Sequence, residues 1–455
     1  MIRLSRTKKT LFLLMLTFIL VGSLPTVSWA TQTAPAITAE AAILIDMKTG
    51  VVLYEKNADK VMEPASITKV LTGLLSIENL NLEDTVTIEE NLNVPGNGMN
   101  LSAGEVLTIR DLLYGMLVHS SNDAAVVLSE QLAPTRAEFN QMAEARAERI
   151  GATHTVVTTP SGLNDVKGNV TTARDLALIC TEAMKNSVFR EAVATVKTTI
   201  PANLVSAERV YANTNLLLYD TKTKLIVNGV ERTPKYDGII GVKTGETSTA
   251  GSCVVAAAKR DGTELLAVIL NAPDKEARFA DSIALLDFGY NNYYTYEAIS
   301  DGEEVDRVLI PGSSKLRVST LVPGGYFITM PKEASASLVT QKIQLNSHLS
   351  APLDKGTEVG TVSFFLAGEK IGEAAIVTAE AVKVGGPWTA WGISDFLAYI
   401  LMAMIGFGLL ILLVGIRIRS KRKKALEKRK RIEEARIAKE QEELTENKRK
   451  RDWPY

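Results

Sequence analysis

A serine and a lysine three residues apart are the first pair in this sequence whose types and spacing could do chemistry together. Ser66 and Lys69 lie at the start of an apolar segment, residues 67–75, that predicts a helix. The spacing puts both side chains on one helix face, and the helix dipole favours an anion developing at the first turn. A serine hydroxyl needs a base to become a nucleophile, and a lysine can serve where burial and a neighbouring cation keep its amine neutral. The pair therefore predicts nucleophilic catalysis by Ser66 with Lys69 as its base.

Two further short motifs supply polar groups that such a reaction needs. Residues 120–122 (Ser-Ser-Asn) interrupt a helical pattern, which places Ser120 and Asn122 in a loop that can face a cleft. Residues 243–245 (Lys-Thr-Gly) end an apolar strand, so Lys243 supplies a second cation and the glycine permits close approach of a substrate backbone. Each motif alone is more often an ordinary surface feature. Their occurrence in this order, on a helix start, a loop and a strand end, predicts one active site.

The elements that must position these motifs predict an α/β domain with an all-helical lobe. Strands are expected at residues 41–46, 51–55, 238–242, 251–259 and 264–272. Helices are expected at residues 109–132 with a break at 119–122, 137–150, 173–184 and 277–288. This order lacks the regular strand–helix alternation of a doubly wound parallel sheet. Residues 301–386 then alternate short β-rich pieces with turns, which predicts a small all-β domain.

The two ends of the chain have the patterns of targeting segments. Residues 1–30 combine a basic start, an apolar run and small residues before position 31, which predicts a cleaved signal peptide. Residues 396–416 carry no charge, and this length is enough to cross a hydrocarbon core of about 30 Å. Residues 417–455 contain 16 Lys/Arg against 8 Asp/Glu, and basic residues flank a span on its cytoplasmic side. We therefore expect a single-pass cell-membrane protein with an extracytoplasmic body and a basic cytoplasmic tail.

Composition and the remaining reactive residues argue against several other functions. The formal net charge of −1 combines an acidic body with the basic tail, unlike a nucleic-acid binder, whose basic charge lies on the folded domain. The three histidines, His119, His154 and His348, are too scattered for a zinc motif, so we expect neither metal nor cofactor. His119 adjoins the second motif without a G-x-S-x-G elbow and is interpreted as a bystander. Cys180 and Cys253 lie in apolar runs and are expected to be buried free thiols.

Together the three motifs resemble those of the low-molecular-mass penicillin-binding proteins, the serine-type D-alanyl-D-alanine carboxypeptidases. The likeness covers about residues 35–386 and extends to the segments 64–72, 104–125, 160–163, 172–176, 241–245 and 351–356. It implies a serine β-lactamase/transpeptidase-like domain, in which helices and the helical lobe accompany an antiparallel sheet, followed by a small all-β domain and a membrane helix. Two features depart from the family pattern. Thr159 stands where relatives often carry Asn, and the anchor is a full spanning helix instead of a short amphipathic one.

The resemblance also implies catalytic roles. Ser66 would be the acylated nucleophile, Lys69 its general base and Ser120 the proton relay to the leaving group. The backbone N–H groups of Ser66 and Glu246 would form the oxyanion hole. The reaction would release the terminal D-alanine of peptidoglycan stem pentapeptides, and β-lactam antibiotics would be covalent inhibitors.

Substrate-binding roles follow from the same resemblance. Lys243 and Thr244 would hold the terminal carboxylate of the substrate, and Asn122 its amide. Arg278 is a candidate for a further contact with the carboxylate. The expected domains are a signal peptide (1–30), the catalytic domain (31–295), the small β-domain (301–386), the transmembrane helix (396–416) and the cytoplasmic tail (417–455).

Three alternatives compete with this interpretation. A β-lactamase needs a deacylating glutamate, and residues 89–93 spell the E-x-x-L-N pattern, but they precede Ser120, whereas the pattern follows the second motif in those enzymes. An inactive wall-binding scaffold would have no reason to keep both lysines and both serines of the motifs. Endopeptidase or transpeptidase action by the same site remains open from sequence.

Overall fold

The computed structural model describes residues 34–163, 168–315 and 317–451. The chain divides into two compact units. The first runs to Tyr296 and adds Thr329–Ser335, and the second takes Glu297–Ile328 and the chain from Ala336 onward. The expected signal peptide, residues 1–30, lies outside the described residues.

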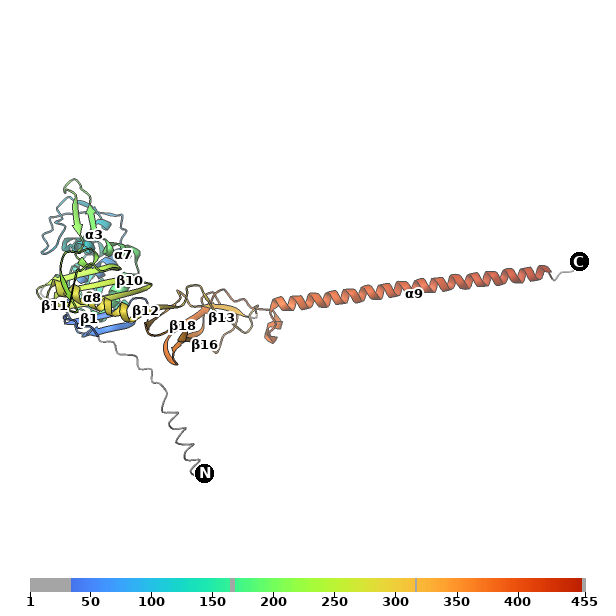
Figure 1. Cartoon of the computed structure of the whole chain (residues 1–455). Helices are drawn as coiled ribbons and strands as arrows, with labels where there is room; N and C mark the ends of the chain where they lie inside the picture. The colour runs from blue at the N-terminus through green and yellow to red at the C-terminus, as the bar shows by residue number, and fades with distance from the viewer. Residues whose placement is uncertain (1–33, 164–167, 316, 452–455) are drawn as a thin grey trace, which may run out of the picture. The chain divides into compact units, whose positions relative to one another are not determined.

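A five-stranded antiparallel sheet forms the centre of the first unit (Figure 1). Its strand order is β2-β1-β11-β10-β9, so the hairpin at the start of the unit pairs with its last strands. β9 lies at one edge and pairs with β10, with Lys243 opposite Val255. The strands are β1 (Ala41–Asp46), β2 (Val52–Lys56), β9 (Ile239–Thr247), β10 (Gly251–Arg260) and β11 (Thr263–Ala272).

Helices cover both faces of this sheet, because successive side chains along each strand point to opposite sides. Ile43 and Val255 join the buried cluster of the helical lobe, whereas Leu44 and Val254 join a second cluster with α8. The helices are η1 (Ala65–Thr68), α2 (Lys69–Asn79), α3 (Ile109–Val118), α4 (Asn122–Leu132), α5 (Arg136–Ile150), α6 (Ala173–Ala183), α7 (Ser187–Ala194) and α8 (Lys275–Asn292). The expected α/β fold with an antiparallel sheet and a helical lobe is confirmed.

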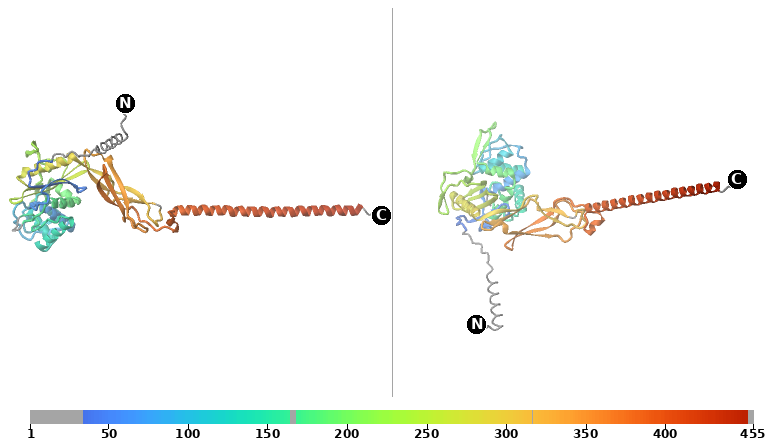
Figure 2. Two further views of the ribbon diagram at one scale, coloured as in Figure 1. Left: turned by 90° about the horizontal axis from the view of Figure 1, so that it is seen from below. Right: turned by 45° about the vertical axis from the view of Figure 1, so that its right-hand side comes forward.

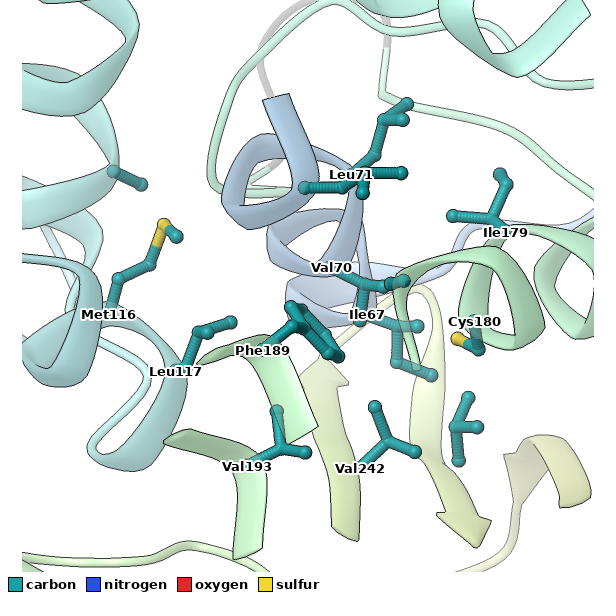
Figure 3. Close-up of a cluster of buried hydrophobic side chains, with 14 of the residues drawn as sticks. Ile67, Val70, Leu71, Met116, Leu117, Ile179, Cys180, Phe189, Val193 and Val242 are labelled. Atoms are coloured by element: carbon teal, nitrogen blue, oxygen red, sulfur yellow. The ribbon is translucent and has the colours of Figure 1, made fainter. Parts of the chain in front are cut away.

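The core behind the first motif is continuous between the lobe and the sheet (Figure 3). Ile67 and Val70 pack in one buried cluster with Phe189 of α7, Val242 of β9 and Cys180 of α6. The prediction of buried free cysteines is confirmed, since Cys180 and Cys253 are both buried and unpaired.

Two boundaries differ from the sequence prediction in ways that affect the site. The α-helix begins at Lys69, and Ser66 lies before it in the 3₁₀ turn η1. β9 continues to Thr247, so the Lys-Thr-Gly motif lies inside the strand and not at its end. Short elements were also missed: α7, η2 (Leu216–Leu218) and the hairpins β3 (Thr85–Thr87) with β4 (Val106–Thr108), β5 (Lys197–Ile200) with β6 (Arg209–Ala212), and β7 (Leu225–Val227) with β8 (Val230–Arg232).

The second unit contains the expected small all-β fold. Its five-stranded antiparallel sheet has the order β13-β14-β18-β17-β16. The chain passes between the units along β12 (Tyr293–Ile299) and β15 (Tyr326–Pro331), which pair with each other. The other elements are β13 (Glu304–Val308), β14 (Val318–Leu321), η3 (Ala336–Leu338), β16 (Val339–Leu345), β17 (Glu358–Leu366), β18 (Glu369–Thr378) and η4 (Pro387–Trp391). Neither β12 nor β16 was expected from the sequence.

One continuous helix, α9 (Asp395–Arg451), ends the described chain (Figure 2). Among the described residues it is the one helix long and apolar enough to cross a membrane, which makes it a candidate anchor. Its first residue is tied to the preceding turn, because Asp395 Oδ1 accepts from Gly386 N at 2.8 Å and from Trp388 Nε1 at 2.7 Å. Trp388 also packs edge-on against Tyr399 of α9.

Candidate active site

Ser66 lies in a turn that two glycines hold by close backbone contact. Ala65 has a φ of +49°, a left-handed conformation that costs roughly 1–3 kcal/mol and persists only where the surroundings impose it. A Cβ at Gly162 would lie 1.9 Å from Ala65 O, and one at Gly245 would lie 2.8 Å from Pro64 O and 3.1 Å from Ser66 N. Glycine is therefore required at both positions. The glycine of the Lys-Thr-Gly motif therefore lets β9 approach the turn of the candidate nucleophile Ser66, residues 64–68, which is called the nucleophile turn below. The approach of a substrate backbone at this glycine stays a prediction.

The Lys69 side chain reaches Ser66 from the first turn of α2. It is fully buried, and its Nζ lies 2.8 Å from Ser66 Oγ, 2.7 Å from Asn122 Oδ1 and 2.7 Å from Ser161 O. The two carbonyl oxygens can only accept hydrogen bonds, whereas a hydroxyl can also donate. A neutral amine has two N–H donors and one lone pair. With both donors on carbonyl oxygens, its lone pair is left to accept the Ser66 hydroxyl proton.

Burial and a second lysine favour the neutral form of this amine. Burial lowers the pKa of Lys69 well below its ordinary value, and the charge of Lys243 lowers it further, while Asp123 acts in the opposite direction. Lys243 is itself 1% exposed. Burial first, and then the charge of Arg278, lowers the pKa of Lys243 to about 7. A buried lysine whose charged form is disfavoured by a neighbouring buried lysine is the arrangement that a lysine base requires.

The second motif occupies the turn between α3 and α4. Asn122 begins α4, where its Oδ1 accepts from Lys69 and its Nδ2 donates to Pro95 O at 2.6 Å. Its backbone N–H donates to Asn97 O at 2.7 Å. Ser120 is nearly buried and has a φ of +66°. The structure thus joins Ser66, Lys69 and Asn122 by direct hydrogen bonds and places Ser120 in the turn that leads into Asn122.

The third motif presents its lysine and threonine along β9. Lys243 Nζ donates to Thr244 O at 3.1 Å, and Thr244 Oγ1 donates to Thr214 Oγ1 at 2.6 Å. Arg278 of α8 is nearly buried, and its Nη1 donates to Gly245 O at 3.2 Å. Arg278 therefore supports the backbone of β9 in addition to placing a positive charge near Lys243.

Several residues that shape the site were not found from the sequence. Ser161 contributes a backbone carbonyl, which no residue type reveals. Asn169 makes a buried side-chain contact with the site and Thr214 a partly buried one, both from loops whose composition is ordinary. The one sequence signal for these contacts is the Thr-Pro-Ser-Gly-Leu segment at 159–163, whose family resemblance predicts no particular contact.

The histidine next to the second motif packs against an aromatic side chain. The His119 ring stacks on Tyr211 with centroids 4.5 Å apart. Burial lowers the pKa of His119, and so does the charge of Lys243. No cluster of His, Cys, Asp and Glu suited to a metal ion occurs within the described ranges.

Two protein-family models match the chain, one over most of the first unit and one over the β-domain of the second unit. The family model for D-alanyl-D-alanine carboxypeptidase matches residues 28–274. The model for the C-terminal domain of penicillin-binding protein 5 matches residues 293–384. The first match alone covers more than half of the chain.

Individual proteins agree with these matches. The chain is 28% identical over 354 residues to D-alanyl-D-alanine carboxypeptidase DacF of Bacillus subtilis, covering 76% of this chain and 87% of that protein. It is 30% identical over 378 residues to D-alanyl-D-alanine carboxypeptidase DacC of Escherichia coli, covering 80% and 89%. Among solved structures, penicillin binding protein 5 from Haemophilus influenzae superposes with a TM-score of 0.66 at 28% identity, covering 77% of this chain and 99% of that one.

Proposed function

The chain belongs to the D-alanyl-D-alanine carboxypeptidase family, and on this premise we propose that it removes the terminal D-alanine of peptidoglycan stem pentapeptides through an acyl-enzyme on Ser66. As a member of the family it is a serine-type carboxypeptidase and a penicillin-binding protein. The observation that carries the proposed mechanism is the buried amine of Lys69, 2.8 Å from Ser66 Oγ with both other contacts on carbonyl oxygens.

Acylation begins when Lys69 accepts the Ser66 hydroxyl proton and Ser66 Oγ bonds to the penultimate D-alanine carbonyl carbon. The backbone N–H groups of Ser66 and Glu246 stabilise the resulting oxyanion. The proton passes through Ser120 to the leaving nitrogen, the C–N bond breaks and free D-alanine departs. Water then attacks the ester, Lys69 again takes the proton, and the shortened peptide is released.

Recognition of the peptide end falls to the residues along β9 and α4. Lys243 and Thr244 hold the terminal carboxylate, and Asn122 holds a substrate amide. The Thr244 hydroxyl donates to Thr214 Oγ1 at 2.6 Å; when a carboxylate binds, this proton turns to the carboxylate, and the Thr214 hydroxyl can donate to Thr244 Oγ1 instead. A terminal carboxylate is the one anion that every peptide end offers, which is why a carboxypeptidase requires a cation here.

Each part of the chain has a role in the proposed function. Residues 31–295 carry the chemistry, and residues 301–386 form the small β-domain. Residues 396–416 span the cell membrane, with the catalytic domain outside and the basic tail, 417–455, in the cytoplasm. Support comes from the apolar first part of α9 and from the basic residues that follow it. Residues 1–30 act as the export signal.

Mass spectrometry after penicillin treatment tests the proposal. A β-lactam should add once to the native chain, and peptide mapping should place the adduct on Ser66. Ser66→Ala should abolish the adduct. Ser121→Ala is the matched control, because Ser121 Oγ is buried without a hydrogen bond in the part of the chain that is described, and it should be acylated normally. An adduct at another residue, or none in the native chain, would refute the assignment.

A further inference from the structure

Asn169 is 3% exposed, and its amide group ties together two segments of the site. Its Oδ1 accepts from Thr158 N at 2.8 Å, from Thr158 Oγ1 at 2.9 Å and from Thr159 N at 2.9 Å. Its Nδ2 donates to Thr159 O at 2.9 Å and to Thr68 Oγ1 at 3.0 Å. Both N–H donors and the carbonyl oxygen are therefore satisfied, in a buried place where an unpaired polar group would cost about 1–3 kcal/mol.

The segment that Asn169 holds, residues 158–163, presents consecutive carbonyl groups to α2. Ser161 O accepts from Lys69 Nζ at 2.7 Å. Pro160 O accepts from Thr72 Oγ1 at 2.7 Å, three residues further along the helix. The position of this segment therefore decides where the acceptor for Lys69 lies.

The other end of the contact is Thr68, which precedes Lys69 in the chain. Thr68 Oγ1 donates to Ala65 O at 2.9 Å and accepts from Asn169 Nδ2. One side chain thus joins the nucleophile turn to the segment that bears the Ser161 carbonyl. A residue that served only to shape the loop would need no contact with the turn.

We propose that Asn169 is a positioning residue, which fixes the direction of the Lys69 lone pair by holding Ser161 O in place against the nucleophile turn. This inference rests on the proposed role of Lys69 as the base. The lone pair points at Ser66 only while both carbonyl acceptors, Asn122 Oδ1 and Ser161 O, occupy the two N–H groups. Displacement of Ser161 O frees one N–H group and lets the amine rotate away from the hydroxyl.

The rate of acylation by a penicillin, measured on the full chain in detergent micelles, tests this role. Asn169→Ala should lower the second-order rate roughly tenfold to a hundredfold, because a misplacement of about 1 Å in a reacting group has an effect of that size. Thr68→Val preserves the side-chain shape, removes the acceptor of the Asn169 contact and should lower the rate in the same direction. Asn140→Ala is the matched control: its Nδ2 donates to Thr158 O at 3.2 Å, so it holds the same loop without a link to the turn, and it should keep the native rate.

The pH profile separates positioning from a loss of folded protein. A carbonyl that accepts from the Lys69 amine favours its charged form, so a weaker contact lowers the pKa of Lys69. The acidic limb of the acylation rate should therefore move to lower pH in Asn169→Ala. Lys243 and Asp123, the charged groups that act on Lys69, are unchanged in the variant. A loss of folded protein alone would scale the rate equally at every pH.

Two results would overturn the inference. One is a native acylation rate in Asn169→Ala, and the other is a rate that falls by the same factor at every pH. If Asn169→Ala does not fold, the isosteric variant Thr68→Val decides the question. A native acylation rate in Thr68→Val, with the acidic limb of its pH profile unmoved, would also overturn the inference. An absence of acylation in the native chain is a different outcome, because it refutes the proposed function itself.

Discussion

Replacing Lys243 by methionine should make the first unit more stable, although it removes the proposed contact with the substrate. The Lys243 side chain is 1% exposed, and its Nζ donates a hydrogen bond to Thr244 O at 3.1 Å. Methionine has a similar length and fills an irregular buried space without a charge. The substitution therefore removes a buried cation and leaves most of the packing of the side chain in place.

The magnitude follows from the pKa. Lowering the pKa of a lysine from 10.5 to about 7 means that the fold disfavours the ammonium by about 5 kcal/mol. Below pH 7 both the native and the unfolded state carry the proton, so the native state bears this cost in full. Between pH 7 and 10.5 the unfolded state binds the proton and the native state does not, so the free energy of unfolding rises with pH. The lost hydrogen bond offsets about 1 kcal/mol. We expect Lys243→Met to stabilise the unit by about 2–4 kcal/mol at pH 6 and by progressively less toward pH 10.5.

Thermal unfolding of the detergent-solubilised chain, followed from pH 6 to pH 10, measures the difference. The melting temperature of Lys243→Met should exceed that of the native chain by roughly 5 °C or more at pH 6, and the gap should narrow as the pH rises. Lys235→Met, at an exposed lysine of the same unit, should leave the melting temperature nearly unchanged. A Lys243→Met chain that is no more stable than the native chain at pH 6 would show that the ammonium is not held at a cost, and the reasoning would be wrong.

Three further predictions concern recognition and topology. Lys243→Ala should reduce kcat/KM roughly tenfold to a hundredfold for a D-Ala-D-Ala peptide, and far less for the same peptide with an amidated terminus; an equal loss for both would contradict carboxylate recognition. Arg278→Gln should raise the pKa of Lys243, because the charge of Arg278 is the second cause of its lowering. The alkaline limb of the pH profile of kcat/KM should then move to higher pH. An unmoved limb would show that the charge of Arg278 does not lower the pKa of Lys243. Protease added to intact cells should degrade the body of the chain and spare residues 417–455, and loss of the tail would reverse the topology.

The sequence predicted the local relations of the site better than its long-range contacts. Ser66 and Lys69 are three residues apart on one turn, and their spacing alone brought the two side chains together. The Ser161 carbonyl approaches Lys69 across 92 positions of sequence. Its place depends on how the loop packs against α2 and on the hydrogen bonds of Asn169. Such a contact belongs to the packed fold, because a backbone carbonyl carries no sequence signal of its own.

The errors in element boundaries have similar causes. β9 was expected to end near Val242 because its apolar residues end there, yet backbone pairing continues through Glu246 opposite Ser252. Ladder hydrogen bonds do not require apolar side chains, so the pattern could not reveal the true end. α7 has eight residues, too few to be stable as an isolated helix, and packing of Phe189 and Val193 in the core stabilises it.

The two buried thiols of the first unit can be used to measure its local opening. Cys253 of β10 lies opposite Gly245 of β9, and Cys180 of α6 packs behind the nucleophile turn (Figure 3). Burial raises the pKa of both thiols, so neither reacts with a thiol reagent while its surroundings stay closed. Modification therefore has to wait for local opening. The labelling rate of Cys253 would report how often the edge of the sheet separates beside the Lys-Thr-Gly motif, and that of Cys180 how often the helical lobe opens behind the nucleophile.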